Sequence, residues 1–151
     1  MNRAQETAQE LLSTLPLLNR IMIMELRQNG EDTTMPQFRV LTYLSDAPMT
    51  VSDIARLRRV SFQSAGELVQ TLVERGWIER TANPNDRRQS LLHLTGAGRD
   101  AYERTQRHIL ERLAGMLESL TPEERVTIQS AMHILQRVLV DEERDDRNTD
   151  G

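Results

Sequence analysis

The stretch from Gly76 to Gly98, GWIERTANPNDRRQSLLHLTGAG, decides the fold of this chain of 151 residues. Its two ends have the composition and alternation of short strands, over residues 77–82 and 90–95. The connection between them is rich in turn-forming residues and carries Arg87 and Arg88 side by side. The stretch therefore predicts a β-hairpin whose tip presents two adjacent arginines.

Three short helices are predicted immediately upstream of this hairpin. The first covers residues 36–45, and the second begins at Thr50, where Asp53 completes an aspartate version of the capping box. The third begins at the N-cap residue Ser61 and is ended by Gly76. Three short helices with a tight turn before the third, followed by a hairpin, predict a winged helix-turn-helix.

Longer helices are predicted on both sides of this module. Apolar residues follow helical spacing from Ala4 to Leu26, and Pro16 should kink this helix or split it into two. Residues 17–24 are apolar around nearly the whole circumference, so we expect more than one face to be buried. Two more amphipathic helices lie downstream, the second opened by Thr121 as N-cap. The apolar stripes near both termini exceed what one small winged module can cover, which favours a dimer.

The composition excludes several classes of protein. The chain has no cysteine, which excludes disulfides, thiolate metal sites and cysteine nucleophiles. Its histidines, His93, His108 and His133, are too dispersed to indicate a metal site, so we expect neither metal nor cofactor. No catalytic motif surrounds any serine, histidine or aspartate, so we expect no enzyme. No apolar run reaches the roughly 20 residues of a membrane helix, and the N-terminus does not resemble a signal peptide. We therefore expect no membrane partner and a cytoplasmic location.

Charge is distributed unevenly along the chain. The whole sequence has a net charge of −4, which is unusual for a DNA-binding protein. Residues 36–95 nevertheless hold eight arginines and six acidic residues, a net charge of +2, and the flanking segments together carry −6. Positive charge is thus concentrated in the predicted winged module, where a nucleic-acid-binding face needs it.

The predicted elements resemble the multiple-antibiotic-resistance repressor (MarR) family of bacterial winged-helix regulators. The segments Gly76–Arg80, Asn85–Arg88 and Leu94–Gly98 are similar to the strand–wing–strand signature of that family in order and spacing. Segments 36–41, 53–55 and 120–125 also resemble family segments. The resemblance extends from about Leu11 to Leu139.

The resemblance implies a triangular, mostly α-helical homodimer in which the N- and C-terminal helices interlock and each subunit presents one winged helix to DNA. The chain is then one intertwined domain, with a dimerisation helix in residues 1–32, a DNA-binding lobe in 33–95 and further dimerisation helices in 96–151. The family typically represses genes, and many members release DNA when a small aromatic or lipophilic acid binds. We therefore expect a repressor that binds a pseudo-palindromic double-stranded DNA operator and is relieved by such an effector. The alternative is a winged-helix module for protein contacts with weak or no DNA binding, which the net acidity favours.

Base contacts are predicted on the third short helix. Its first turns should reach base edges in the major groove, and the residues concerned are Phe62, Gln63, Ser64, Ala65 and Glu67. Glu67 stands where many family members carry a basic residue. It either accepts a hydrogen bond from a cytosine amino group or is a solvated surface charge.

Further contacts are predicted around this helix. The resemblance implies that Asp86 braces the hairpin while an arginine, Arg87 or Arg88, enters the minor groove, where negative potential is concentrated. Arginines that could contact phosphates are Arg39, Arg56, Arg58, Arg59 and Arg80, although a surface arginine needs no ligand.

An effector pocket is predicted where the N-terminal helix meets the helix that starts at residue 36. Its candidate lining residues are Met22, Met24, Met35, Phe38, Arg39 and Tyr43. Methionine suits adaptable pockets, and Arg39 could neutralise an acid there. The alternative is that these residues are plain core or dimer seam.

Overall fold

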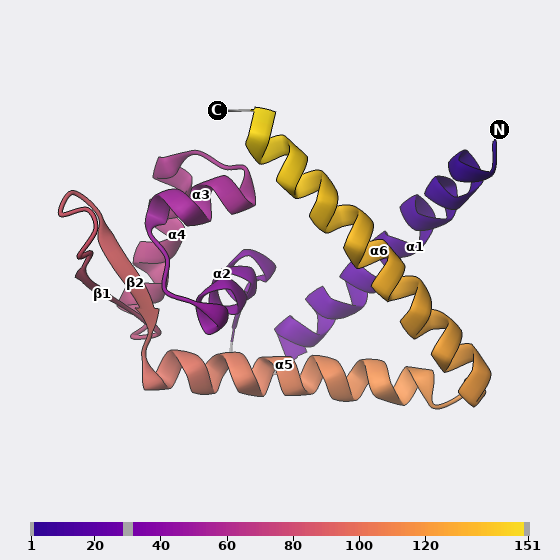
Figure 1. Cartoon of the computed structure of the whole chain (residues 1–151). Coiled ribbons are helices and arrows are strands. Elements are labelled where there is room, and N and C mark those ends of the chain that lie inside the picture. The colour runs from indigo at the N-terminus through magenta and orange to yellow at the C-terminus, as the bar shows by residue number, and fades with distance from the viewer. Residues whose placement is uncertain (1, 29–31, 150–151) are drawn as a thin grey trace. The chain divides into compact units, whose positions relative to one another are not determined.

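The computed structural model describes residues 2–28 and 32–149, with side chains as far as residue 142. Within these ranges the chain forms six helices and a two-stranded antiparallel sheet (Figure 1). In chain order the elements are α1 (Arg3–Gln28), α2 (Met35–Asp46), α3 (Val51–Arg58), α4 (Phe62–Glu74), β1 (Ile78–Ala82), β2 (Ser90–Leu94), α5 (Gly96–Leu117) and α6 (Pro122–Thr149). The predicted fold class, mainly α-helical with a small β wing, is confirmed.

The chain divides into two compact units, Met1–Leu110 and Glu111–Gly151. The division of roles between residues 1–32, 33–95 and 96–151 stays a prediction.

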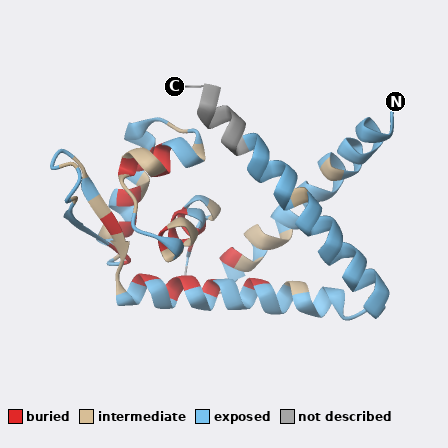
Figure 2. Ribbon diagram, viewed as in Figure 1, coloured by how far each residue is buried: buried red, intermediate tan, exposed pale blue. Residues whose placement is uncertain are grey.

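The first unit is built around an apolar core to which all its short elements contribute (Figure 2). Fully buried side chains include Leu41 on α2, Ile54 on α3, Leu72 on α4, Ile78 on β1 and Leu92 on β2. Burying side chains of this size stabilises the fold by about 1.5–3 kcal/mol each. The core therefore fixes α4 and the hairpin on one common support.

Each of the three short helices begins with a side chain that caps it. Thr50 and Asp53 form the predicted capping box, in which each side chain accepts the other residue's backbone N–H. The hydroxyl of Ser61 accepts the backbone N–H of Ser64 at 3.1 Å, as a helix N-cap does. A further capping box, not predicted, joins Thr34 to Gln37 at the start of α2.

The hairpin pairs its two strands in antiparallel register, from Ile78 opposite Leu94 to Ala82 opposite Ser90. These bounds confirm the predicted strands to within one residue at each end. The backbone of Met49 adds a single bridge to the outer side of β2, because Leu92 N–H donates to the Met49 carbonyl at 2.7 Å. The bridge ties the turn between α2 and α3 to the hairpin.

Two glycines and a threonine join the hairpin to the helices on either side of it. Gly76 has a φ of +76°, a left-handed conformation that glycine adopts without strain. The Thr95 hydroxyl donates to the Gly76 carbonyl at 2.6 Å and accepts the Gly98 N–H at 3.0 Å. A Cβ on Gly98 would overlap the carbonyl oxygen of Trp77. Backbone geometry therefore favours glycine at Gly76 and at Gly98.

Helix α1 is continuous through Pro16, so the predicted possibility that it splits there is wrong. The expectation that residues 17–24 bury more than one face is also not met within the chain. Leu17 is 55 % exposed and Met24 50 % exposed, while residues 21–23 are half-buried. These exposed side chains form an apolar surface on α1.

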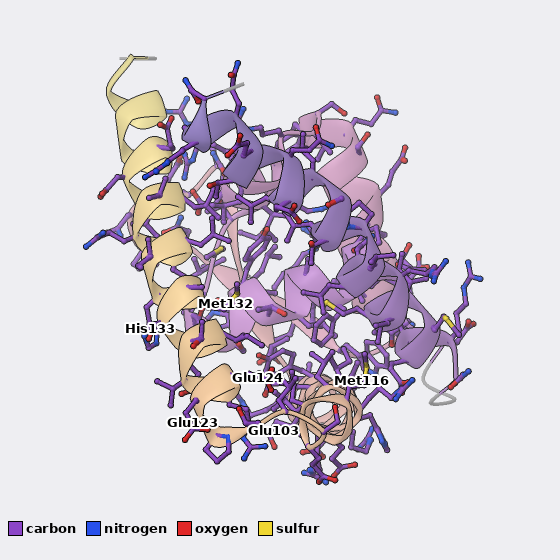
Figure 3. All side chains as sticks on the ribbon, turned by 90° about the vertical axis from the view of Figure 1, so that its right-hand side faces the viewer. Glu103, Met116, Glu123, Glu124, Met132 and His133 are labelled. Atoms are coloured by element: carbon purple, nitrogen blue, oxygen red, sulfur yellow. The ribbon has the colours of Figure 1, made fainter. Side chains whose placement is uncertain are left out.

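The second unit, Glu111–Gly151, contains the end of α5 and all of α6. Among the α6 side chains that the structure describes, residues 122–142, Leu135 is half-buried and the others are exposed. The exposed residues include the predicted apolar stripe except Leu135, and also Met132, which is 45 % exposed and lies beside His133 on the helix in Figure 3. An amphipathic helix exposed in this way presents its apolar stripe to solvent.

Candidate nucleic-acid interface

Helix α4 has two distinct faces. Ala65, Val69 and Leu72 recur at steps of four and three residues and are fully buried, so this stripe holds the helix against the core. Phe62, Gln63, Ser64 and Glu67 are exposed. Ala65 therefore has no side-chain surface to offer a base, and its predicted DNA contact is corrected to a packing role.

The polar residues at the start of α4 already bond to one another. The Gln63 side-chain amide donates to the Glu67 carboxylate at 3.4 Å, one helical turn away. The Ser61 hydroxyl donates to the Ser64 hydroxyl at 3.0 Å. Glu67 is thus an orienting partner of Gln63 in the free protein, whichever of its two predicted roles it has toward DNA.

The tip of the hairpin is ordered by Asp86. Its carboxylate accepts the backbone N–H of Arg88 at 2.9 Å, and the Asp86 carbonyl accepts the N–H of Gln89 at 3.3 Å. The Arg88 side chain is 94 % exposed, and its Nε lies 3.7 Å from the same Asp86 oxygen. Arg87 is also exposed. Two guanidinium groups are therefore presented to solvent from a turn that hydrogen bonds hold in shape.

Several of the arginines predicted to contact phosphates have protein partners. Arg56 forms an ion pair of 2.8 Å with Asp53, and Arg80 donates to the Gln70 amide oxygen on α4 at 3.3 Å. Arg58 is half-buried at the end of α3. Arg59 caps that helix in a left-handed conformation, with a φ of 52°. Arginines thus lie at the end of α3 as predicted, in the turn that leads into α4.

The pKa of the Asp53 carboxylate departs clearly from its ordinary value. Partial burial raises the pKa, but hydrogen bonds from the Thr50 N–H and hydroxyl oppose this. The hydrogen bond and charge of Arg56 act in the same direction, and the pKa of Asp53 is lowered overall. The ionised form of Asp53 therefore holds the start of α3.

Sequence reasoning missed the contacts of Arg75, which follows α4. Its guanidinium lies 3.6 Å from the centre of the Trp77 ring. It also donates to the Asp32 carbonyl at 3.1 Å and to the buried Gln37 amide oxygen at 3.2 Å. An arginine two residues before a tryptophan was the available signal. One side chain thus connects the end of α4, the start of the hairpin and the start of α2.

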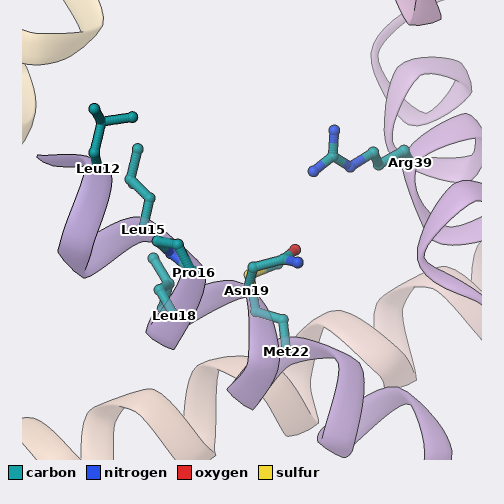
Figure 4. Close-up of a pocket in the computed structure, with 7 residues that line it drawn as sticks. All are labelled: Leu12, Leu15, Pro16, Leu18, Asn19, Met22 and Arg39. Atoms are coloured by element: carbon teal, nitrogen blue, oxygen red, sulfur yellow. The ribbon is translucent and has the colours of Figure 1, made fainter.

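A pocket of about 500 Å³ lies between α1 and α2 and brings together two of the six predicted effector residues (Figure 4). The Arg39 side chain extends from α2 toward Met22 and Asn19 on α1. The rest of the lining is apolar and comes from Leu12, Leu15, Pro16 and Leu18. An apolar wall facing one cation is chemistry that suits an organic acid.

The other four predicted effector residues lie elsewhere. Phe38 is buried, and its ring stacks on that of Tyr102 with 5.8 Å between the ring centroids. Phe38 therefore belongs to the core. Met35 lines a separate cavity of about 310 Å³, and Met24 is exposed. Tyr43 is half-buried outside both cavities. The predicted lining set therefore reduces to Met22 and Arg39.

Residues 2–28 and 32–142, whose side chains are described, contain no group of three or more histidine or acidic residues placed to hold a metal ion. Within the described ranges, no helix combines the length and apolar character needed to cross a lipid bilayer.

Comparison with known proteins agrees with this geometry. Residues 31–89 match the sequence model described as the MarR family. The multiple antibiotic resistance protein MarR of Escherichia coli is 31 % identical over 110 residues, which cover 72 % of this chain and 74 % of that protein.

Solved structures share the fold over nearly the whole chain. The crystal structure of RV1404 from Mycobacterium tuberculosis superposes with a TM-score of 0.80 at 29 % identity, covering 91 % of this chain and 95 % of that one. Streptococcus pneumoniae FabT, crystallised in complex with DNA, gives a TM-score of 0.70 at 23 % identity, with coverage of 91 % and 98 %. The latter likeness bears on the fold alone.

Proposed function

Because the chain belongs to the MarR family, and is thus a DNA-binding transcriptional regulator rather than an enzyme, we propose that it is a homodimeric repressor of a pseudo-palindromic operator. We further propose that a small aromatic or lipophilic acid relieves the repression. The observation that carries the DNA-binding part is the two-faced α4, whose apolar stripe is buried while Gln63, Ser64 and Glu67 are exposed beside an arginine-tipped hairpin.

In the proposed complex, α4 lies in the major groove and the hairpin reaches the adjacent minor groove. The first turn of a recognition helix is the part that contacts base edges. An arginine inserted into a narrow minor groove gains from its concentrated negative potential. The exposed Arg87 and Arg88, on a turn ordered by Asp86, suit this second role. FabT, a neighbour of the same fold, was crystallised in complex with DNA.

Dimerisation is proposed from the apolar side chains that the isolated chain leaves exposed. On α1 these include Leu12 and Leu17, and on α6 they include Val126, Ile134 and Leu139, each at least 50 % exposed. Large apolar side chains exposed in this number on one helix are typical of an association site. A two-fold dimer would place two recognition helices about 34 Å apart, one turn of DNA.

The effector part of the proposal rests on the pocket between α1 and α2. Arg39 supplies the positive charge for a carboxylate, and Met22 with the leucines of α1 supplies the apolar wall. An effector bound there can shift the protein away from DNA only to the extent that it prefers the non-binding arrangement. The cytoplasmic location stays a prediction.

A titration of the protein with its own promoter duplex and with a random duplex, over a series of salt concentrations, tests the DNA-binding part. A repressor should bind the promoter more tightly, with a steep loss of affinity as salt rises because arginines displace counterions from phosphates. Equal, weak and salt-insensitive binding to both duplexes would instead support the protein-contact module. Sedimentation of the free protein tests the dimer, and a monomer persisting at micromolar concentration would overturn it.

A further inference from the structure

Phe62 is an unusual residue on the exposed face of α4. It is the first residue of that helix and is 61 % exposed, whereas Phe38, Trp77 and Tyr102 are each at most 9 % exposed. Covering an apolar ring that is exposed to water lowers the free energy of the system. The ring lies next to Gln63 and Ser64, the residues from which base contacts are proposed.

The polar neighbours of Phe62 are already engaged within the helix. Gln63 bonds to Glu67, and the Ser64 hydroxyl bonds to that of Ser61. A base contact by either residue competes with, or must be added to, an existing hydrogen bond. A contact by Phe62 displaces only water. The ring is therefore the group of this first turn with most to gain from an apolar feature of the groove.

The major groove offers one such feature. Each base edge presents hydrogen-bond donors or acceptors there, and thymine alone adds a methyl group. Phenylalanine has neither donor nor acceptor, so it can favour one base only through apolar contact. We propose that Phe62 determines specificity by packing on the 5-methyl group of one thymine in each half of the operator. The inference rests on the proposed entry of α4 into the major groove.

Replacing thymine by uracil tests this directly, because deoxyuridine lacks only the methyl group. Wild-type protein first selects a duplex from a randomised pool, and each thymine is then replaced singly by deoxyuridine. At one thymine in each half-site the affinity should fall about four-fold, the effect expected for one buried methyl group. Replacement at the other thymines should change little. Phe62→Ala should bind the thymine duplex more weakly and show no difference between thymine and uracil at that position.

Two further variants serve as controls for the effect of Phe62→Ala. Phe62→Leu keeps an apolar side chain and should retain part of the thymine preference. Leu57→Ala removes another exposed apolar side chain, 42 % exposed on α3, and should retain the full preference. The inference is overturned if wild-type protein tolerates uracil everywhere, or if Phe62→Ala still prefers thymine. If no duplex is selected or bound at any salt concentration, the proposed function itself fails, which is a separate result.

Discussion

The Asp86 carboxylate accepts the backbone N–H of Arg88 at 2.9 Å, and the same oxygen lies 3.7 Å from the Arg88 Nε. The backbone contact shapes the turn, while the longer contact, at a side chain that is 94 % exposed, contributes little stability by itself. Asp86 therefore fixes mainly the position of the Arg88 backbone, from which the side chain extends. The guanidinium group stays available to a phosphate or a groove.

Arg88→Ala should weaken operator binding by about 1–3 kcal/mol, the size of one good groove contact. The melting temperature and the state of association should hardly change, because the side chain is almost wholly exposed. A mobility-shift titration measures the affinity. Arg107→Ala, which removes an exposed arginine from α5, is the matched control for charge and should have a much smaller effect. Equal affinities of wild type and Arg88→Ala would refute the proposed wing contact.

Asp86→Ala should weaken DNA binding to a similar degree without touching DNA, because the turn loses its acceptor for the Arg88 N–H. Asp86→Asn keeps an oxygen at the same place and should recover much of the affinity. The same titration compares the two variants. If the asparagine variant is as weak as the alanine variant, the charge of Asp86 matters rather than the hydrogen bond.

Gly98→Ala should destabilise the fold by roughly 1–3 kcal/mol, the usual cost of forcing an atom into a packed site. The added methyl group would overlap the Trp77 carbonyl, which belongs to the backbone and has little room to move. Gly66→Ala is the control, since nothing lies within 4 Å of its Cβ position. That change should stabilise α4 by up to about 1 kcal/mol. Thermal unfolding without DNA distinguishes these opposite signs.

The lowered pKa of Asp53 predicts a loss of stability in acid. The pKa in the folded state lies below the ordinary value of 3.8 that applies in the unfolded chain. The contribution of Asp53 is therefore complete above that value and is lost as the pH falls through the folded pKa. Asp53→Asn removes the negative charge at the start of α3, which should cost about 0.3–1 kcal/mol at pH 7. This difference in stability should shrink at about pH 3. Denaturant unfolding at both pH values measures it, with Asp46→Asn as control for the loss of one negative charge.

Salicylate-type acids should bind more weakly to the DNA-bound protein than to the free protein, by the same factor by which they lower DNA affinity. Arg39→Gln should reduce binding of the acid while leaving the fold unchanged, because Arg39 is an exposed wall of the pocket. Calorimetry with and without cognate duplex measures both effects. If no acid in a broad panel binds the protein or changes its affinity for DNA, the effector proposal is contradicted and the protein is a constitutive repressor.

Features with local causes could be predicted from the sequence. The Thr50–Asp53 box, the Ser61 cap and the hairpin depend on residues a few positions apart, and their patterns are short. The predicted DNA contact of Ala65 was wrong, because a position on the first turns of a helix does not determine which way the side chain faces. Its spacing to Val69 and Leu72 held that information. Arg75 escaped prediction for another reason, since its partners Asp32 and Gln37 lie 43 and 38 residues away.

The shared contacts of Arg75 have a mechanical consequence. One guanidinium stacks on Trp77 at the root of the hairpin and bonds to residues at the start of α2, while its own backbone ends α4. A tilt of α4 alone would have to break these contacts, and so would a rotation of the hairpin alone. We therefore expect α4 and the hairpin, the two elements proposed to contact DNA, to move as a rigid body. In the proposed dimer, regulation would then change the distance between the two winged modules and leave the conformation of each module unchanged.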